Sequence, residues 1–408
     1  MFKSIFHTYK KSFAGLSHET WLLSTVILIN RCGFMAVPFM SLYVTQYLHR
    51  PASDAGLIIT LFGIGSIAGA STGGFLTDKI GYRPVQILAA TIGGSLFLVF
   101  SAITHFSTLC LLSLIISFFT EAFRPANFTA TAAYAKQGTQ TRSYSLNRLA
   151  MNLGWAVGSS LGGILASINY RLLFIVDGSI NIVAGLSILW LLPSGKEYVK
   201  KLKEKMESAI VKRPWQDKIF VRFILVTTIF AICFFLMFRV APLFFKEKWH
   251  INESLIGIVL ALNGIIIAIF EMIMISHLEK RRAPLQYAII GSAFVGMSFL
   301  FLTLPHLHVL TAFVSMVFFT VGEMFALPFI NTFVISRTDE LNRGQYAAGY
   351  TLCWSVAQVV GPAGGFYFAE KFNYSLLWIL LCLFLAVCAL GYYFLHNKTQ
   401  VEEAMLST

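Results

Sequence analysis

Long apolar runs recur along the whole chain and are separated by short polar segments. A helix needs about 20 mainly apolar residues to cross the hydrocarbon core of a bilayer. Runs of this length predict an all-α integral membrane protein with twelve membrane-spanning helices in two six-helix bundles. The predicted spans are Thr20–Leu48, Ala55–Thr77, Val85–Thr104, Thr108–Tyr134, Ser145–Ile168, Leu172–Leu192, Ile219–Phe245, Ser254–His277, Leu285–Leu304, Val309–Ile335, Tyr346–Ala369 and Ser375–Leu395.

One polar interruption is much longer than the others. Pro193–Lys218 carries eight Lys or Arg and four Asp or Glu and contains no apolar run. It divides the chain into an N-terminal bundle of residues 1–192, a basic linker of residues 193–218 and a C-terminal bundle of residues 219–408 with a short tail. The mixed polar and basic segment Met1–Glu19 precedes a run long enough to span a bilayer, so we expect no cleavable signal peptide.

The distribution of Lys and Arg predicts the orientation in the membrane. With the N-terminus inside, 23 of the 31 basic residues fall on the inner side, 5 on the outer side and 3 within spans. Because positive charge concentrates on the cytoplasmic side of membrane proteins, both termini are predicted to be cytoplasmic. The same bias accounts for the net charge of +12 without a nucleic-acid partner. Charged residues make up only 12% of the chain, about half the usual share of a soluble domain.

The two halves are related by an internal repeat. Matching residues lie 201 to 204 positions apart throughout, with both copies in the same orientation. The matches are Gly56 and Gly63 with Gly257 and Gly264, Glu121 with Glu323, Arg142 with Arg343, Gly162-Gly163 with Gly364-Gly365, and Asn169-Tyr170 with Asn373-Tyr374. In transporters built from such parallel repeats, the substrate site lies between the repeats near the bilayer midplane.

The loop after the second predicted span carries a family signature. Gly74-Phe-Leu-Thr-Asp78-Lys79-Ile-Gly81-Tyr82-Arg83 resembles the G-x-L-a-D-[RK]-x-G-[RK]-[RK] loop of the major facilitator superfamily, although Tyr82 replaces a basic residue. The resemblance covers essentially the whole chain and implies alternating access. It implies that Gly74, Asp78, Lys79, Gly81 and Arg83 form a gating latch at the cytoplasmic mouth. The alternative is a plain positive-inside loop.

A second likeness involves glycines of the fifth and eleventh spans. Gly158-Ser-Ser-Leu-Gly162-Gly163 is similar to the G-P-x-x-G-G motif of the drug-exporting, proton-antiporting branch, with serine in place of proline. Gly361-Pro362-Ala-Gly364-Gly365 is the copy in the second half and is one residue shorter. Ordinary close packing of helices through small residues explains the same pattern, so the motif supports export only weakly.

Ionisable residues inside the spans are the candidate coupling groups. Each costs at least about 2.5–3.5 kcal/mol at the bilayer centre, so a chain that keeps several is expected to use them. The candidates for proton coupling are Glu121, Glu323, Arg31, Arg124, Glu271 and Asp177. Arg31 and Glu121 have similar depths, and we expect them to pair, with Arg124 one turn deeper. Protonation of Glu121 would then release the pair and couple a proton to helix movement.

The other buried acids differ in their expected surroundings. Glu323 occupies the position equivalent to Glu121 but has no arginine beside it, so we expect it to carry the proton or meet a cationic substrate. Glu271, in the eighth span, is suited to either role. Asp177 lies near Arg171 toward the outer surface, which also suits a partly hydrated structural acid. Arg239 is near the outer end of the seventh span, where it can snorkel to the surface.

Polar and aromatic groups near mid-span are the candidates for substrate binding. They are Asn30, Phe34, Asn127, Arg239, Asn263, Phe325, Asn331, Trp354 and Gln358. The sequence contains no nucleophile with a base, no metal-ligand cluster and no phosphate-binding glycine loop, so we expect no catalytic residue, metal or cofactor and no ATP-driven pump. The six cysteines have no metal or redox spacing and suit apolar packing.

Three functions remain at this stage. The first is a proton-coupled exporter of lipophilic or amphipathic compounds, expected to be a monomer in a bacterial inner membrane. The second is a proton symporter that imports a small peptide, sugar or organic acid, because the cluster of Arg31, Glu121 and Arg124 suits a carboxylate. The third, a non-transporting sensor or membrane enzyme, is disfavoured by the signature loop and the duplication.

Overall fold

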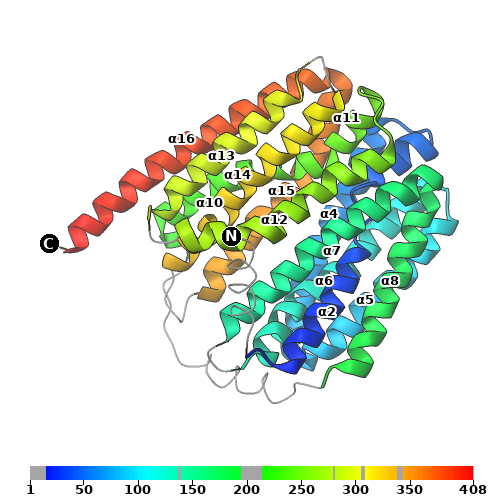
Figure 1. The fold of residues 1–408 in the computed structure, drawn as a ribbon, viewed down its shortest axis with the longest axis horizontal. Helices are drawn as coiled ribbons and strands as arrows, with labels where there is room; N and C mark the ends of the chain where they lie inside the picture. Colours follow the sequence, from blue (N-terminus) through cyan, green and yellow to red (C-terminus); the bar gives the residue numbers. More distant parts are fainter. Residues whose placement is uncertain are drawn as a thin grey trace, which may run out of the picture. The chain divides into compact units, whose positions relative to one another are not determined.

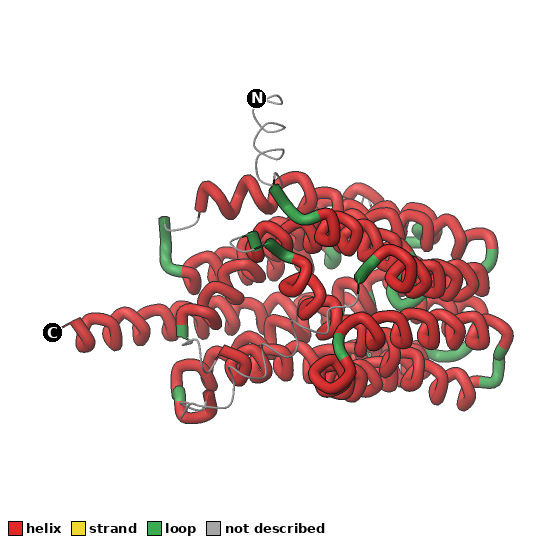
Figure 2. Tube along the Cα trace, turned by 90° about the horizontal axis from the view of Figure 1, so that it is seen from below, coloured by secondary structure: helices red, strands yellow, loops and turns green. Residues whose placement is uncertain are grey.

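The computed structural model describes residues 15–136, 139–193, 214–278, 281–304, 308–337 and 343–407, and in these ranges every regular element is a helix (Figure 2). The chain forms two compact units: Met1–Val37 with Leu61–Glu207, and Pro38–Thr60 with Ser208–Thr408. The sequence had divided the chain at the linker, whereas here Pro38–Thr60 belongs to the second unit. Most of the linker, residues 194–213, lies outside the described residues.

The helices of both units are labelled in Figure 1. The first unit contains α2 (His18–Cys32), most of α4 (Ala52–Ile80), α5 (Tyr82–Ala102), α6 (Phe106–Tyr134), α7 (Gln140–Ile168) and α8 (Tyr170–Leu191). The second contains α3 (Met40–Leu42), the π-helical turn η1 (Tyr43–Tyr47), the short 3-10 helix η2 (Pro214–Gln216), α10 (Lys218–Arg239), α11 (Ala241–Glu247), α12 (Glu253–Leu278), α13 (Pro284–Phe301), α14 (His308–Ser336), α15 (Arg343–Lys371) and α16 (Tyr374–Ser407).

Each of the twelve predicted spans is mostly helical where it is described, and ten are long and apolar enough to cross a membrane by length and composition alone. The other two are the first span, which is interrupted, and the eleventh, α15. Within α15 the run of glycines and polar residues dilutes the apolar character, although the helix is continuous over 29 residues. The all-helical architecture predicted from the apolar runs is therefore confirmed.

Two spans that the sequence predicts as continuous are broken at equivalent places. The first helix stops at Cys32, and helical structure resumes only at Met40. The seventh stops at Arg239 and resumes as α11 at Ala241. Both breaks lie beside a proline, Pro38 and Pro242, whose separation of 204 positions falls within the repeat offset. Proline lacks the amide hydrogen and its ring opposes the carbonyl four residues earlier, which favours a kink or a break in a helix at that point.

The packing of helices also repeats between the two units. Contacts of α2 with α7 and α8 in the first unit correspond to contacts of α10 with α15 and α16 in the second, and contacts of α5 with α6 and α8 correspond to those of α13 with α14 and α16. Prolines lie inside the matching helices α6 and α14, at Pro125 and Pro328. In each case a threonine four residues later, Thr129 or Thr332, donates to the carbonyl of the proline. The repeat thus extends to individual hydrogen bonds.

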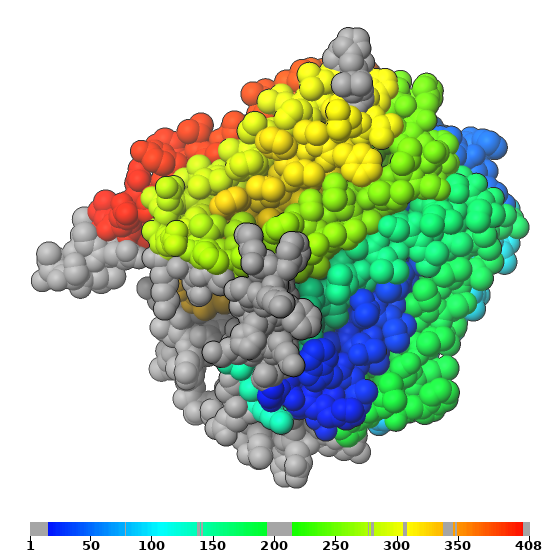
Figure 3. Space-filling model, viewed as in Figure 1, coloured from blue at the N-terminus to red at the C-terminus, as the bar shows by residue number. Residues whose placement is uncertain are grey.

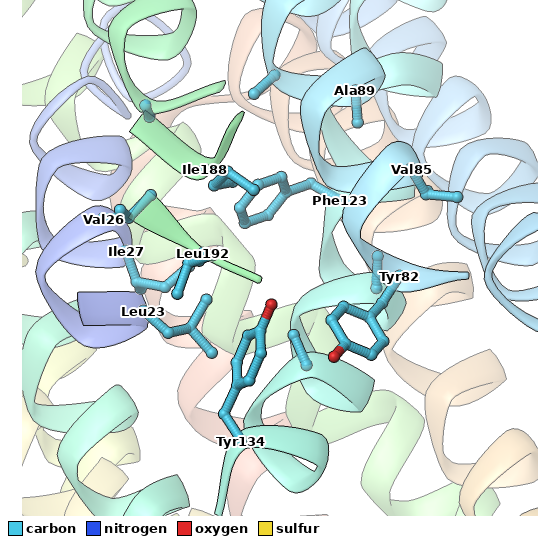
Figure 4. Packing of buried hydrophobic residues seen from close by; sticks show 14 of the residues in the cluster. Leu23, Val26, Ile27, Tyr82, Val85, Ala89, Phe123, Tyr134, Ile188 and Leu192 are labelled. Carbon is cyan, nitrogen blue, oxygen red and sulfur yellow. The ribbon is translucent and has the colours of Figure 1, made fainter. Parts of the chain in front are cut away.

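Glycines allow α4 to approach α6 without intervening side chains. Gly65, Gly69 and Gly73 follow one another at four-residue spacing, and a Cβ at each would overlap the backbone of α6. Lipid tails are as apolar as the helices, so helix association in a bilayer relies on this close van der Waals packing. Near the inner ends of the same unit, α2, α5, α6 and α8 meet in a cluster of buried apolar side chains (Figure 4).

The second unit is tied together at its predicted cytoplasmic end by a polar cluster. Asp217 caps α10 by accepting hydrogen bonds from the amides of Ile219 and Phe220, both at 3.0 Å. Its other oxygen accepts from Arg337 at 2.6 Å and from Tyr346 at 3.2 Å. Burial alone would raise the pKa of the Asp217 carboxyl, but the hydrogen bonds from Arg337 and Phe220 outweigh this effect and hold the pKa below its usual value.

The last helix takes part in the same cluster. Arg337 also donates to Glu402 of α16 at 3.0 Å. With 34 residues, α16 is about 51 Å long at ~1.5 Å per residue, well beyond the ~30 Å of a hydrocarbon core. Its C-terminal part projects past α13 and α14 of its own unit (Figures 1 and 3). The cluster therefore anchors the C-terminal part of α16 to the N-terminal end of α10.

Candidate functional site

A small cavity inside the first unit brings together charged, amide and aromatic side chains. Its volume of about 20 Å³ is enough for roughly one water molecule. The broken first helix, α4, α5, α6 and α8 all contribute to its walls. The lining residues are Asn30, Arg31, Phe34, Phe62, Phe97, Thr120, Glu121, Asp177 and Asn181. Four of the predicted site residues on the first helix and α6, together with Asp177, thus surround one cavity.

The break in the first helix forms one wall of this cavity. After Cys32 the chain makes two tight turns, in which the amide of Phe34 donates to the carbonyl of Arg31 at 3.1 Å and the amide of Met35 to that of Gly33 at 2.8 Å. A Cβ on Gly33 would lie 2.9 Å from Cγ2 of Ile180 in α8, so only glycine allows this approach. The break therefore lies directly against α8.

Asp177 of α8 is the most completely enclosed charged group of the cavity, with 1% of its surface exposed. Oδ2 accepts a hydrogen bond from the amide of Ala36, in the break, at 3.1 Å. Oδ1 accepts from Nδ2 of Asn181 at 2.7 Å, and Oδ1 of Asn181 accepts from Nδ2 of Asn30 at 2.7 Å. Asp177 therefore faces the first helix and the small cavity, which has room for about one water molecule, and not the outer surface near Arg171 as expected.

Arg31 is the last-turn residue of α2, and its guanidinium lies over the ring of Phe34, 5.4 Å from the centroid. Glu121, Arg124 and Asp177 are the charged groups that act on it electrostatically. Arg31 and Glu121 line the same cavity, but none of the ion pairs among the described residues joins them. Equal depth along two helices places two groups at one level without turning them toward each other, and the direct pairing predicted from depth is not formed in this structure.

The second unit holds its acid differently. Glu323 of α14 accepts a hydrogen bond from Nδ2 of Asn263 in α12 at 2.7 Å, and the same amide group lies 3.1 Å from Oγ1 of Thr320. Glu323 is 9% exposed, and Glu271, two turns further along α12, is 5% exposed. The sequence had assigned Asn263 to the substrate and Glu323 to the proton. The structure instead joins them, because α12 packs against α14.

The remaining predicted binding residues have varied surroundings. Phe325 stacks on Tyr287, at 6.3 Å between centroids, and contributes to the packing of α13 on α14. Trp354 packs edge-on against Phe234 at 5.5 Å. Asn127 and Arg239 are buried, Gln358 is half-buried, and Asn331 and Arg124 are exposed within the computed structure.

The structure describes the signature loop, residues 74–83, apart from the side chain of Asp78. Gly81 has φ of 95°, a conformation that favours glycine, and it forms the N-cap of α5. Arg83 donates to the carbonyl of Leu189, in the last turn of α8, at 2.6 Å. A cation at a helix C-terminus meets unsatisfied carbonyls and is stabilised there. Lys79 lies over the ring of Phe75 at 6.0 Å, and Gly74 lies in α4.

The glycines of the second motif lie between helices. A Cβ on Gly158 of α7 would be 2.9 Å from the carbonyl oxygen of Cys32, beside the break in the first helix. In α15, a Cβ on Gly361 would be 3.3 Å from the carbonyl oxygen of Ile232, while Gly364 meets nothing within 4 Å. The other residues of the two motifs, all within the same two helices, are Gly162, Gly163, Pro362 and Gly365.

Sequence reasoning missed Asn181, which connects Asp177 to the first helix. A signal was present, because Asp177 and Asn181 are four residues apart and therefore lie on one helix face. It also missed the rings of Phe62 and Phe97, since nothing in a run of apolar residues marks the few that face a cavity. In the described ranges no group of three or more His, Cys, Asp or Glu side chains forms a candidate metal site.

Apolar spanning helices in two units with repeated packing, and buried charges around a small cavity, define a multi-pass transporter of small molecules. The chain belongs to the Major Facilitator Superfamily, whose model matches residues 23–362.

The similar proteins are transporters, not enzymes. A Na(+), Li(+), K(+)/H(+) antiporter of Planococcus maritimus is 23% identical over 82% of this chain and 85% of its own length. The multidrug resistance protein MdtH of Yersinia pestis (strain Pestoides F) is 20% identical over 95% of this chain and 96% of its own. A solved POT family transporter in complex with 5-aminolevulinic acid has a TM-score of 0.79 at 14% identity, covering 95% of this chain and 97% of that one, and shows the shared fold.

Proposed function

We propose that this chain is a proton-coupled secondary active transporter that exports small lipophilic or amphipathic compounds by alternating access. The observation that carries the proposal is the cavity of the first unit, where Arg31, Glu121 and Asp177 are enclosed among spanning helices. Enclosing three ionisable groups inside a membrane is costly, and such groups commonly mark proton relays or substrate pathways. We further propose a bacterial inner membrane and a monomer.

Two features support export. Aromatic rings of Phe34, Phe62 and Phe97 line the same cavity as the charges. In a state in which this cavity opens, they would offer apolar surface to an amphipathic compound. Among similar proteins, one is named a multidrug resistance protein and another a cation/proton antiporter. The glycine motifs, which resemble that of the proton-antiporting branch, add weak support for export.

One observation favours a second function, proton-driven import of a polar solute with a carboxylate. The guanidinium of Arg31 lines the cavity and, in the described residues, forms no direct ion pair with an acid of this chain. A guanidinium presents a planar fork of donors that matches a carboxylate. The solved POT family transporter similar in fold binds 5-aminolevulinic acid, which carries such a group.

Proton flux measured in proteoliposomes separates the two functions. The purified protein is reconstituted with a pH-sensitive dye inside, and a panel of cationic dyes and drugs is added, followed by small peptides and organic acids. Proton movement opposite to a lipophilic compound establishes antiport and export. Proton movement together with a carboxylate establishes symport, and no proton movement with any transported compound contradicts coupling.

The variant Glu121→Gln tests the cavity directly. We expect gradient-driven transport to fall at least about 100-fold, a size typical of a lost proton-transfer group, while the protein remains folded. Glu19→Gln is the matched control, because Glu19 lies in the first turn of α2 and is not among the residues lining the cavity. Full activity of Glu121→Gln would remove Glu121 from the coupling scheme.

A further inference from the structure

The break in the first helix leaves a backbone amide that needs an acceptor. Ala36 lies between the two helical parts and is fully buried. A buried amide without an acceptor costs free energy comparable to a lost hydrogen bond. Its acceptor is Oδ2 of Asp177, at 3.1 Å. A single ionisable side chain of α8 therefore holds the shape of the first helix.

The neighbouring amides determine which oxygen of Asp177 can take a proton. Asn30 donates to Oδ1 of Asn181, so the oxygen of the Asn181 amide is already engaged. The NH₂ group of Asn181 must then face Asp177, where it donates to Oδ1. Both oxygens accept a hydrogen bond, but the bond to Oδ1 is the shorter, at 2.7 Å against 3.1 Å to Oδ2. An incoming proton therefore goes to Oδ2, the oxygen that accepts from Ala36.

Protonation therefore acts directly on the break. A hydrogen bond to an ionised carboxylate is roughly twice as strong as one to a neutral group. When Oδ2 carries a proton it becomes a donor and a poorer acceptor, and the amide of Ala36 loses its strong partner. The turns at Gly33 to Phe39 are then free to change conformation, and Gly33 transmits the change because it touches Ile180 of α8.

The surroundings allow a proton to reach Asp177. Arg31 from the first helix and Glu121 from α6 are the charged groups that share the cavity, and Arg124 acts on Arg31 from one turn along α6. From α4 and α5 the lining residues are the uncharged Phe62 and Phe97, and α7, which packs on α8, contributes none of the lining residues. The cavity has room for a water between these groups.

We propose that Asp177 is the proton-binding residue of the first unit, that its ionised carboxylate holds the break in the first helix through the amide of Ala36, and that Asn30 and Asn181 position it. This inference rests on the proton coupling proposed above and names Asp177, rather than Glu121, as the group whose proton moves a helix.

Hydrogen–deuterium exchange tests the proposal on the full-length protein in lipid nanodiscs. The observable is the exchange rate of a peptide covering residues 33–39, corrected for the intrinsic pH dependence of amide exchange, between pH 5 and 9. In the wild type we expect protection to drop about tenfold as Asp177 is protonated, the equivalent of one hydrogen bond to a charged group. In Asp177→Asn the corrected rate should not vary with pH, while Glu121→Gln should keep the wild-type step.

A second variant tests the positioning role. Asn30→Ala frees Oδ1 of Asn181, which can then accept a hydrogen bond from protonated Asp177. The midpoint of the exchange step should therefore move to higher pH without disappearing. A merely structural role of Asn30 would change protection equally at every pH and leave the midpoint in place.

The outcomes separate this inference from the proposed function. A pH step that persists in Asp177→Asn, or that is lost in Glu121→Gln, overturns the assignment to Asp177. The exchange step can depend on Asp177 even if the protein moves no protons in proteoliposomes. This combination upholds Asp177 as a proton-binding residue and contradicts the proposed proton-coupled transport. If Asp177→Asn does not fold, the midpoint in Asn30→Ala decides: an unshifted midpoint overturns the proposal.

Discussion

Replacing Asp217 by alanine should destabilise the second unit strongly, although the residue lies at the N-terminal end of α10 and not within the helix. Asp217 both caps α10 and forms an ion pair with Arg337, and their side chains are 7% and 15% exposed. Loss of an N-cap costs about 1 kcal/mol. Truncating one partner of a buried ion pair costs about 3–5 kcal/mol. Arg337 keeps its contact with the more exposed Glu402, so we expect the lower end of this range and a total of about 4 kcal/mol.

The assay is unfolding of the purified protein by titration of SDS in mixed micelles, followed by tryptophan fluorescence. Asp54→Ala is the matched control, because Asp54 forms an exposed i,i+4 ion pair with Arg50 that is worth about 0.3–0.5 kcal/mol. Equal losses of unfolding free energy in the two variants would refute the argument from burial and capping. In the double variant with Arg337→Gln, strictly additive losses would show that the two groups do not interact.

The contribution of Asp217 to the unfolding free energy should also depend on pH, in a direction that its pKa determines. The pKa of Asp217 in the folded protein lies below its usual value, because hydrogen bonds from Arg337 and Phe220 outweigh the effect of burial. Its stabilising contribution is therefore complete above the unfolded pKa of about 3.9 and is lost as the pH falls toward the folded value. The difference between wild type and Asp217→Ala should be constant near neutral pH and shrink below about pH 4.

Three further predictions concern the membrane part and the signature loop. Gly69→Ala should lower the unfolding free energy by about 1–3 kcal/mol, because the added Cβ would overlap the backbone of α6. Gly74→Ala in the same helix is the control: its Cβ would meet its nearest neighbour at 4.0 Å, so the thermal midpoint should not change. Asn263→Ala should cost about 1–3 kcal/mol by removing the hydrogen bond to Glu323, and an unchanged midpoint would show that this bond contributes nothing. Asp78→Asn should slow gradient-driven transport without changing the apparent affinity for the substrate, and unchanged rates would mean that the loop is only topological.

The positions of the spans and the repeat could be predicted from the sequence because they depend on local properties. An apolar run long enough to cross a bilayer has few alternatives to a helix, since backbone groups in lipid must be paired within the segment. The offset of 201 to 204 residues likewise needs no structure to be recognised. The two breaks could not be predicted in this way, because Pro38 and Pro242 are visible in the sequence but so are Pro125 and Pro328, which lie inside unbroken helices.

The partners of the buried groups could not be predicted in this way. The spacing of residues gives the depth of Arg31, Glu121 and Asp177 along their helices, but not the rotation of each helix about its own axis. Those rotations result from the packing of α2 on α7 and α8 and of α4 on α6, where Gly65, Gly158 and others permit close approach. The sequence by itself therefore determined the membrane architecture, the duplication and the set of candidate charges. Only the tertiary structure decided that Asp177 meets the amide of Ala36 and that Glu323 meets Asn263, because these contacts depend on how neighbouring helices are rotated against one another.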